Sequence, residues 1–269
     1  LGIVLSGVLC FLSAACRNSP PAPSESLSWN VTPGAAESTS AAEVTAASTS
    51  SGQSEDADRI GFGIRNLQSK DSTWVLSRMA VEIDRLPAEY ERYTVGTWVG
   101  EIGRLMTTRN FIVTDAGGQR IAAASTLWAM IDVKTRQPLD LRDNVDYSRA
   151  LLAIPCPIDK PAKIGRIEGV PCDSRRVRYS DIDFNQHTNS MKYIQWMLDA
   201  LPLEKLTGCR MKRLDVNFVH ETRYGQQLVV CCEYGTDRDR FEIRFEDGTA
   251  ACKAAIRWET SDERSNQTA

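Results

Sequence analysis

Seven residues, Asp181–His187, bring together two carboxylates, the carboxamide of Asn185 and one of the chain's two histidines. Asp183, Asn185 and His187 alternate, so in an extended segment their side chains would share one face. A histidine donates or accepts a proton near neutral pH, an amide places a water or a carbonyl, and a carboxylate orients its neighbours. The residue types therefore predict a site for attack on a carbonyl group.

The element that follows this run is predicted to be a helix from about Asn189 to Ala200. Its apolar residues cover most of the circumference, which is typical of a buried helix wrapped by a sheet. Asn189 or Ser190 can cap its start, and Pro202 would end it. The polar run thus precedes a helix N-terminus, where free backbone N–H groups stabilise developing negative charge.

The rest of the chain after residue 66 reads as β-strands. Two turn signals, Ala116-Gly117-Gly118 and Glu246-Asp247-Gly248, predict tight hairpins. The expected strands form two groups of four: Thr73–Asp84, Tyr93–Val99, Leu105–Asp115 and Arg120–Val133, then Arg210–Val219, Leu228–Tyr234, Phe241–Phe245 and Thr249–Trp258.

The two groups repeat each other. Two triplets of a phenylalanine, a glycine and a tryptophan have the same spacings of 7 and 10 residues: Phe111, Gly118 and Trp128, and Phe241, Gly248 and Trp258. Residues Arg78–Ile83 resemble Arg213–Phe218 at an offset of 135, whereas the triplets are offset by 130, so one loop differs by five residues. This order indicates a duplicated unit, each copy a helix followed by a long antiparallel sheet. The first copy has no recognisable opening strand and little of a helix near residues 54–65.

Length and composition set wider limits. The chain has 269 residues, 42% of them hydrophobic and 25% charged, which is ordinary for a globular protein. A net charge of −3 argues against nucleic acid as the main partner. Eight cysteines without a CxxC pair, and only two histidines, predict neither a metal site nor a disulfide scaffold. We expect mostly reduced thiols in a reducing compartment, and no cofactor.

The N-terminal segment differs from the rest. Leu1–Cys16 is apolar and resembles the core of an export signal, with Cys16 at the place of a lipidation site, but it is too short to span a bilayer. From Arg17 to about Asp56 the chain is rich in Ser, Ala, Thr, Pro and Gly, a composition typical of disorder or of a faulty reading of the gene.

These features divide the chain into five parts. We expect a disordered or anomalous segment (1–56), a first unit (57–133), a linker (134–173), a second unit (174–260) and a tail (261–269).

The run at 181–189 and its surroundings resemble the acyl-[acyl-carrier-protein] thioesterases of plastids and many bacteria. The resemblance covers about residues 60–259 and is carried by Asp181–Asn189 with Lys192, Tyr193, Ile194 and Trp196, supported by Trp74–Met79, Thr97-Trp98, Arg109–Phe111 and Thr135–Pro138. It implies an α+β fold of two tandem hot-dog units, the first incomplete at its N-terminus and non-catalytic, with the acyl-chain pocket. It also implies hydrolysis of fatty acyl thioesters carried by acyl carrier protein, which ends fatty acid synthesis in the cytoplasm.

The resemblance also assigns a catalytic set. Asp183 would orient, Asn185 would position the water or carbonyl, His187 would donate a hydrogen bond, and Glu221 would act as general base. The cysteine that older schemes of this family placed after the glutamate is Thr222 here, so the sequence favours activated water over a thiol nucleophile.

Only one active site per chain is expected. Aligning the copies by their 135-residue offset puts Leu86 opposite Glu221 and Arg85 opposite His220, so the first unit has no carboxylate at that place.

Other interpretations of the same residues stay open at this point. The Asp-x-Asn-x-His run is also typical of a capping and turn cluster, Asp181 is a structural cap rather than a catalyst, and Glu221 can be an exposed charge at a strand end. His220 is expected to have an ordinary strand partner, and five tryptophans are expected mainly in the core. A basic group either meets an acidic carrier protein or forms a solvated strand face: Arg210, Lys212 and Arg213.

Competing functions are a hot-dog dehydratase and a non-catalytic acyl-thioester-binding module. As partners we expect acyl carrier protein with a fatty acyl chain, no nucleic acid and no stable membrane span, in a monomer or homodimer.

Overall fold

The computed structural model describes residues 29–31, 71–88, 91–144, 154–183, 185–236 and 238–259. The chain divides into two compact units between Lys160 and Pro161, apart from Arg78–Ala80, which group with the C-terminal unit. Several expectations concern residues outside the described part of the chain. These are the export-like segment, most of the low-complexity region, the stretch near residues 54–65 at the place of the first unit's helix, and the tail.

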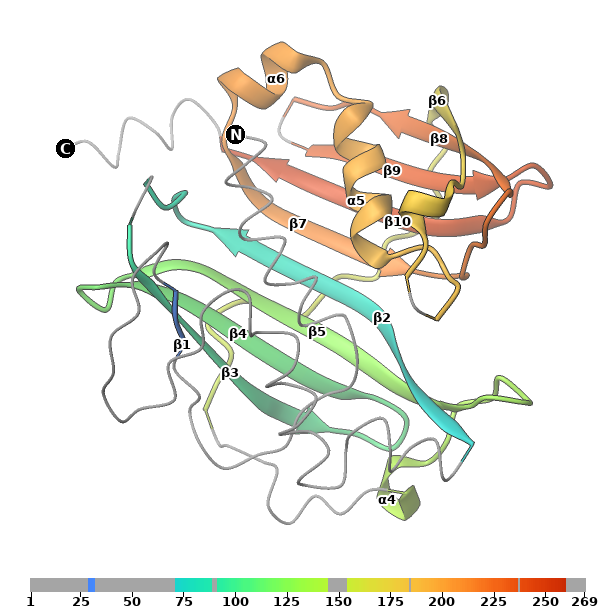
Figure 1. Ribbon diagram of the computed structural model, residues 1–269. Helices are drawn as coiled ribbons and strands as arrows, with labels where there is room; N and C mark the ends of the chain where they lie inside the picture. The colour runs from blue at the N-terminus through green and yellow to red at the C-terminus, as the bar shows by residue number, and fades with distance from the viewer. Residues whose placement is uncertain are drawn as a thin grey trace. The chain divides into compact units, whose positions relative to one another are not determined.

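Antiparallel strands form the N-terminal unit (Figure 1). Their order is β1-β3-β4-β5-β2, and the unit's short helix is α4 (Leu141–Asn144). The strands are β1 (Trp29–Val31), β2 (Ser72–Ile83), β3 (Tyr93–Ile102), β4 (Thr107–Asp115) and β5 (Arg120–Asp132). Trp74, Trp128, Met130 and Leu141 form a buried cluster in this unit. The short β1, which pairs with the start of β3, was not predicted from the sequence.

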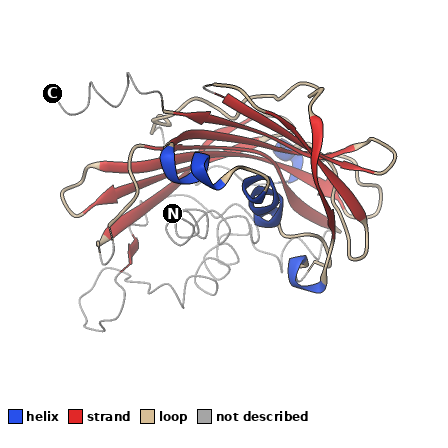
Figure 2. Cartoon of the chain, turned by 90° about the horizontal axis from the view of Figure 1, so that it is seen from above, coloured by secondary structure: helices blue, strands red, loops and turns tan. Residues whose placement is uncertain are grey.

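The C-terminal unit is an antiparallel sheet with a helix against one face (Figures 1 and 2). The strands follow the order β7-β10-β9-β8-β6. Their bounds are β6 (Val170–Arg176), β7 (Met211–Phe218), β8 (Gln227–Glu233), β9 (Arg238–Phe245) and β10 (Ala250–Trp258). A 3-10 turn η1 (Tyr179–Asp181) and the helices α5 (Ser190–Asp199) and α6 (Leu203–Gly208) lie between β6 and β7.

Helix α5 is the predicted buried helix. Asn189 caps it by accepting the Met191 N–H at 2.9 Å, and the ring of Tyr193 lies edge-on to Phe218 of β7 at 6.1 Å. Pro202 follows the end of α5 as predicted, but it also caps the start of α6, which the sequence did not reveal.

The opposite face of this sheet is covered by residues 161–167. Asp215 and Asn217 alternate with Phe218 and its inward neighbours along β7, so they project away from α5. Their side-chain oxygens accept the Ala162 and Ile164 N–H groups, each at 2.9 Å. The segment thus supplies partners for polar side chains that would otherwise be exposed, which explains why Asp215 and Asn217 are buried.

The duplication is confirmed by strand register. Phe111 pairs with Ala124 in the N-terminal unit and Phe241 with Ala254 in the C-terminal unit, which preserves the offset of 130. Both hairpins turn through a glycine with positive φ, 81° at Gly118 and 83° at Gly248, a conformation that a side chain would oppose.

The 135-residue offset is confirmed as well. The N–H groups of Asp84 and Arg85 both donate to the Ile121 carbonyl, at 2.9 and 3.3 Å. The N–H groups of Val219 and His220 both donate to the Ala251 carbonyl, at 2.9 and 3.0 Å. These equivalent contacts place Leu86 of the first copy at the position of Glu221.

All eight expected strands form, with ends shifted by three residues at most. β6 is an additional strand whose first residues, 170–173, fall in the expected linker. It was missed because Pro171 and the alternating charges that follow do not resemble a strand, although both are tolerated at a sheet edge.

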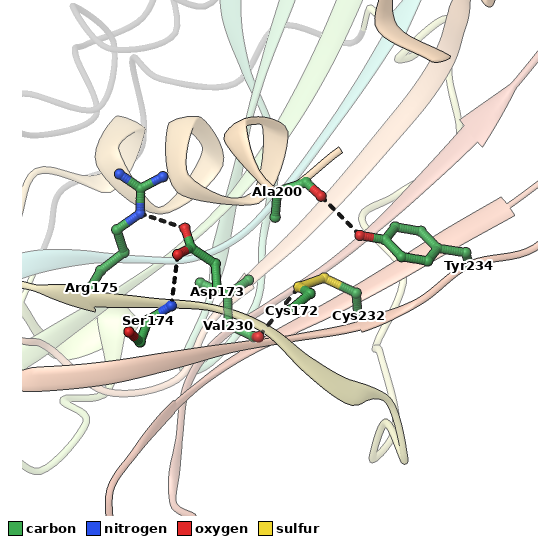
Figure 3. Close-up of a disulfide and its surroundings, with 8 residues drawn as sticks. All are labelled: Cys172, Asp173, Ser174, Arg175, Ala200, Val230, Cys232 and Tyr234. Carbon is green, nitrogen blue, oxygen red and sulfur yellow. Dashed lines mark hydrogen bonds and ion pairs between the residues drawn. A yellow bond between two sulfur atoms is a disulfide. The ribbon is translucent and has the colours of Figure 1, made fainter. Parts of the chain in front are cut away.

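Most of the cysteines in the described residues are free thiols, as expected, but one pair forms a disulfide. Cys172 of β6 and Cys232 of β8 form a disulfide across 60 residues of chain (Figure 3). The register pairs Pro171 with Cys231 and then shifts, which leaves Cys172 beside Cys232 with a Cα–Cα distance of 5.9 Å. That separation is typical of a bridge, and only the fold creates it. The other cysteines of the described residues are free thiols: Cys156, Cys209, Cys231 and Cys252.

Candidate functional site

The predicted histidine and glutamate meet in the C-terminal unit. His187 Nε2 lies 3.3 Å from Glu221 Oε2, and the two side chains are 22% and 32% exposed. His187 comes from the loop before α5, whereas Glu221 follows β7 by three residues. The fold therefore joins two groups 34 residues apart into a pair that a ligand in solvent can reach.

The loop that carries His187 is not extended, which corrects the expectation of one shared face. One oxygen of the Asp183 carboxylate accepts the N–H groups of Asn185 and His187, at 2.8 and 3.4 Å. The Asp183 N–H donates to the His187 carbonyl at 2.9 Å, and Gln186 adopts a positive φ of 62°. An aspartate folds a chain in this way because its carboxylate competes for nearby backbone donors.

Asp183 thus orients the loop backbone. Its carboxylate accepts the backbone N–H of His187 and does not bind the imidazole ring. Asn185 is exposed, and its backbone N–H makes the contact with Asp183. The structure brings Asp183, His187 and Glu221 together around one loop. It leaves the Asn185 carboxamide at the exposed surface of that loop.

Asp181 is confirmed as a structural residue. Its carboxylate accepts the Arg178 N–H at 2.8 Å and lies 3.6 Å from Lys192 Nζ, and its carbonyl accepts the Asn189 N–H at 2.8 Å. These contacts close the η1 turn and join it to the start of α5.

The second histidine has an ordinary partner, as predicted. His220 Nδ1 lies 2.8 Å from the Ala250 carbonyl, which can only accept, so Nδ1 is the donor. This contact joins the end of β7 to β10 and leaves Glu221 as the next side chain along the loop.

A buried hydroxyl cluster beneath the site was not predicted. Thr222 is 0% exposed, and its Oγ1 lies 2.6 Å from Thr188 Oγ1 and 2.8 Å from the Tyr193 hydroxyl. Burial raises the pKa of Tyr193 to about 12, so this hydroxyl stays protonated at neutral pH. Thr222 lies 29 positions from Tyr193 and 34 from Thr188 in the sequence, and no spacing shows that they are in contact.

Two of the three basic residues considered for a solvated strand face, Arg210 and Arg213, are engaged in ion pairs. Arg210 pairs with Glu259, and Arg213 Nε lies 2.8 Å from Asp215 Oδ2 on the covered face of the sheet. The expectation of a solvated strand face is therefore wrong for Arg213, which is buried.

The five tryptophans that were expected in the core are buried. Five are 2 to 8% exposed: Trp74, Trp98, Trp128, Trp196 and Trp258. Among the described helices, none combines the length and apolar character needed to cross a membrane.

Comparison with known proteins identifies relatives of both units. Residues 29–147 match the family model of the acyl-ACP thioesterase N-terminal domain, and residues 169–260 match that of the C-terminal domain. The first match begins upstream of residue 60, where the sequence resemblance started.

Individual relatives agree with this match. The crystal structure of an acyl-ACP thioesterase from Bacteroides thetaiotaomicron is 36% identical, with a TM-score of 0.71, over 77% of this chain and 84% of that one. A palmitoyl-acyl carrier protein thioesterase from Cuphea hookeriana is 28% identical over 74% of this chain and 51% of its own length. A 12:0-ACP thioesterase from Umbellularia californica, at 20% identity and a TM-score of 0.60, has the same fold. The chain spans about half the length of the curated relatives it matches.

Proposed function

Because the chain belongs to the acyl-ACP thioesterase family, we propose that it hydrolyses fatty acyl thioesters of acyl carrier protein. The products are a free fatty acid and the holo carrier protein, so the reaction ends fatty acid synthesis. The observation that carries the proposal is the contact of 3.3 Å between His187 and Glu221. In this contact the proposed general base, Glu221 after β7, lies beside the proposed proton donor, His187 in the partly exposed loop before α5.

The proposed reaction uses water as nucleophile. Glu221 takes a proton from the water as its oxygen attacks the acyl carbon, and the carbon–sulfur bond then breaks. The departing sulfur takes a proton from His187, which regains one from Glu221 through their contact. No thiol takes part, since Thr222 follows Glu221.

The other two residues of the proposed set support this pair. Asp183 holds the backbone of the loop, so the position of His187 depends on the Asp183 carboxylate. Asn185 offers its exposed carboxamide to the thioester carbonyl or to the water. The oxygen that becomes negative in the transition state needs such a donor, and N–H groups placed in advance are worth several kcal/mol.

The N-terminal unit has a different role in this proposal. Leu86 stands where the second copy has Glu221, and a leucine neither accepts nor donates a proton. We assign the chemistry to the C-terminal unit alone, and scaffold and acyl-chain pocket to the N-terminal unit.

We propose that the carrier protein contacts two Arg-Tyr pairs beside the site. The Gly225 N–H donates to the Val177 carbonyl at 2.9 Å, which holds Arg178-Tyr179 near Arg223-Tyr224. Tyr179 is 87% and Tyr224 70% exposed, and both arginines are exposed as well. This surface is better suited to an acidic partner than Arg210 and Arg213, which already have carboxylate partners.

The reaction is tested by the release of free thiol from acyl-carrier-protein substrates of several chain lengths. Wild type is expected to release thiol, and His187→Ala and Glu221→Gln are expected to lower kcat by roughly 10²- to 10⁴-fold. His220→Ala is the matched control, because its ring donates to the Ala250 carbonyl and no contact with the proposed catalytic residues is seen in the described structure. Wild-type rates in both site variants would refute the assigned site, and an inactive wild type would favour a binding module.

A further inference from the structure

The hydroxyl cluster below the site has a defined direction of hydrogen bonding. The Tyr193 hydroxyl accepts the Thr222 N–H at 3.1 Å, and Thr222 Oγ1 donates to Thr188 Oγ1. The Thr222 hydroxyl has one hydrogen, so in its contact with Tyr193 it accepts and the tyrosine donates. The high pKa of Tyr193 keeps that hydrogen in place at neutral pH.

The two threonines are also joined through the backbone. The Thr188 N–H donates to the Thr222 carbonyl at 2.8 Å, in addition to the bond of 2.6 Å between their hydroxyls. Thr188 directly follows His187, and Thr222 directly follows Glu221. His187 and Glu221, the two reacting residues of the proposed site, are therefore sequence neighbours of two threonines that two hydrogen bonds hold together.

Tyr193 fixes this pair to the helix. Its ring is buried in the first turns of α5, between Trp196 at 5.6 Å and Phe218 at 6.1 Å, so its hydroxyl has little freedom to move. Neither His187 nor Glu221 lies within a described helix or strand, and neither inherits its position from a ladder of backbone hydrogen bonds. The anchored threonines constrain both residues, in addition to the contacts of Asp183 with the His187 backbone.

From these contacts we propose that Thr222, held by Tyr193 and Thr188, is the positioning residue that sets the distance between His187 and Glu221. The inference rests on the proposed hydrolysis. Each hydrogen bond contributes only about 0.5–1.5 kcal/mol to stability, but a displacement of about 1 Å at reacting groups can cost about 10²-fold in rate. The threonine hydroxyls thus affect turnover more than folding.

Substitution of Thr222 separates positioning from packing. Thr222→Val keeps the shape and removes both hydroxyl bonds, whereas Thr222→Ser keeps the hydroxyl. We expect the valine variant to lose about 10- to 100-fold in kcat with KM within about twofold, and serine to restore most of kcat. Rates are measured on carrier-protein substrate at a temperature where circular dichroism shows each variant folded.

Tyr193→Phe provides a second route if the valine variant does not fold. It is expected to lower kcat in the same direction, since Thr222 loses a partner for its N–H and for its hydroxyl. Tyr234→Phe is the matched control, because the Tyr234 hydroxyl donates to the Ala200 carbonyl at 2.8 Å, at the other end of α5 (Figure 3). Its kcat is expected to stay at the wild-type value.

The outcomes distinguish two failures. Equal kcat for the valine and serine variants, or a loss confined to KM, would overturn the positioning role while His187→Ala stays inactive. Full activity of His187→Ala and Glu221→Gln would instead overturn the proposed reaction.

Discussion

The pair of His187 and Glu221 illustrates why exposure matters at the scale of single residues. A fully buried pair of this kind would have a structural role, because burial that removes water from the two side chains also keeps the substrate away from them. Here the side chains are 22% and 32% exposed, and the residues that fix them are buried one position later in the chain. In the proposed site, the reacting groups are therefore partly exposed to solvent, and the hydroxyls of the residues that follow them in sequence are buried.

Asp183 offers a test of how a carboxylate acts in this loop. Asp183→Asn keeps an oxygen that can accept the N–H groups of Asn185 and His187, whereas Asp183→Ala removes it. We expect the asparagine variant to retain kcat within about tenfold and the alanine variant to lose about 10²-fold, as in removal of an orienting group. Steady-state release of thiol measures both. An equally large loss in asparagine would show that the negative charge, and not the loop, is what the reaction needs.

At the scale of elements, the segment 161–167 is part of the C-terminal fold and more than a connection. Asp215 links the Ala162 N–H to the Arg213 guanidinium on a covered face of the sheet. Asp215→Ala would leave a buried cation without this carboxylate, which costs about 3–5 kcal/mol of unfolding free energy. Urea denaturation followed by tryptophan fluorescence measures the loss.

The control for that substitution is an exposed ion pair. Lys134, 74% exposed beside Asp71, is expected to leave the denaturation midpoint unchanged when replaced by alanine. Equal midpoints for Asp215→Ala and wild type would show that residues 161–167 do not stabilise the sheet.

The disulfide is the other element-scale constraint, because it ties the edge strand β6 to β8. Cross-linking residues 60 apart restricts the unfolded chain, so Cys172→Ser should lower the unfolding free energy of the oxidised protein by roughly 2–4 kcal/mol. Thermal melts with and without dithiothreitol check this: the reductant should shift the wild-type midpoint and leave the variant's unchanged. A wild type that does not respond to reductant would mean that Cys172 and Cys232 are thiols in solution.

The elements were predictable from sequence to the extent that local pattern determines them. β4, β5 and their glycine hairpin follow from strand-forming residue types and turn signals, and the repeat indicated the second copy of each. The pairing of His187 with Glu221 came from family resemblance, since no local rule joins positions 34 apart. The hydroxyl cluster was not predicted, because nothing in a sequence distinguishes a tyrosine or threonine with a buried hydroxyl from an ordinary helix or loop residue. Its members are Tyr193, Thr188 and Thr222.

At the scale of the whole molecule, the two hot-dog units share one architecture and differ at a residue of the proposed site. Their hairpins agree in register down to the same bulge, since Thr114 pairs with Arg120 as Arg244 pairs with Ala250. A duplicated chain can keep one copy's site and release the other copy for a different task. In our proposal, the difference between Leu86 and Glu221 at equivalent positions reflects such a division.

Location is a property of the whole protein that stays a prediction. We propose the cytoplasm, supported by the free thiols of four described cysteines, while the Cys172–Cys232 bridge favours an oxidising compartment. Differential alkylation and mass spectrometry of the protein from its native cells would decide this. Alkylated Cys172 and Cys232 are expected in the cytoplasm, and an intact bridge would contradict that location.

Recognition of a macromolecular substrate is the last property that belongs to this scale, because a carrier protein contacts more surface than the thioester does. If the exposed arginines at 178 and 223 meet an acidic carrier, reversing both charges with Arg178→Glu and Arg223→Glu should raise KM for carrier-protein substrate by about tenfold or more, with kcat nearly unchanged.

The controls separate docking of the carrier from binding of the thioester. Hydrolysis of a small acyl thioester without a carrier should not change. Added salt should raise KM for wild type and have little effect on the double variant, because salt screens attraction between exposed charges. Arg238→Glu reverses a single charge on β9, away from the two Arg-Tyr pairs in sequence, and serves as the control for charge reversal elsewhere on the chain. A KM that rises equally for both substrates would place these arginines in thioester binding, and an unchanged KM would exclude this surface as the docking site.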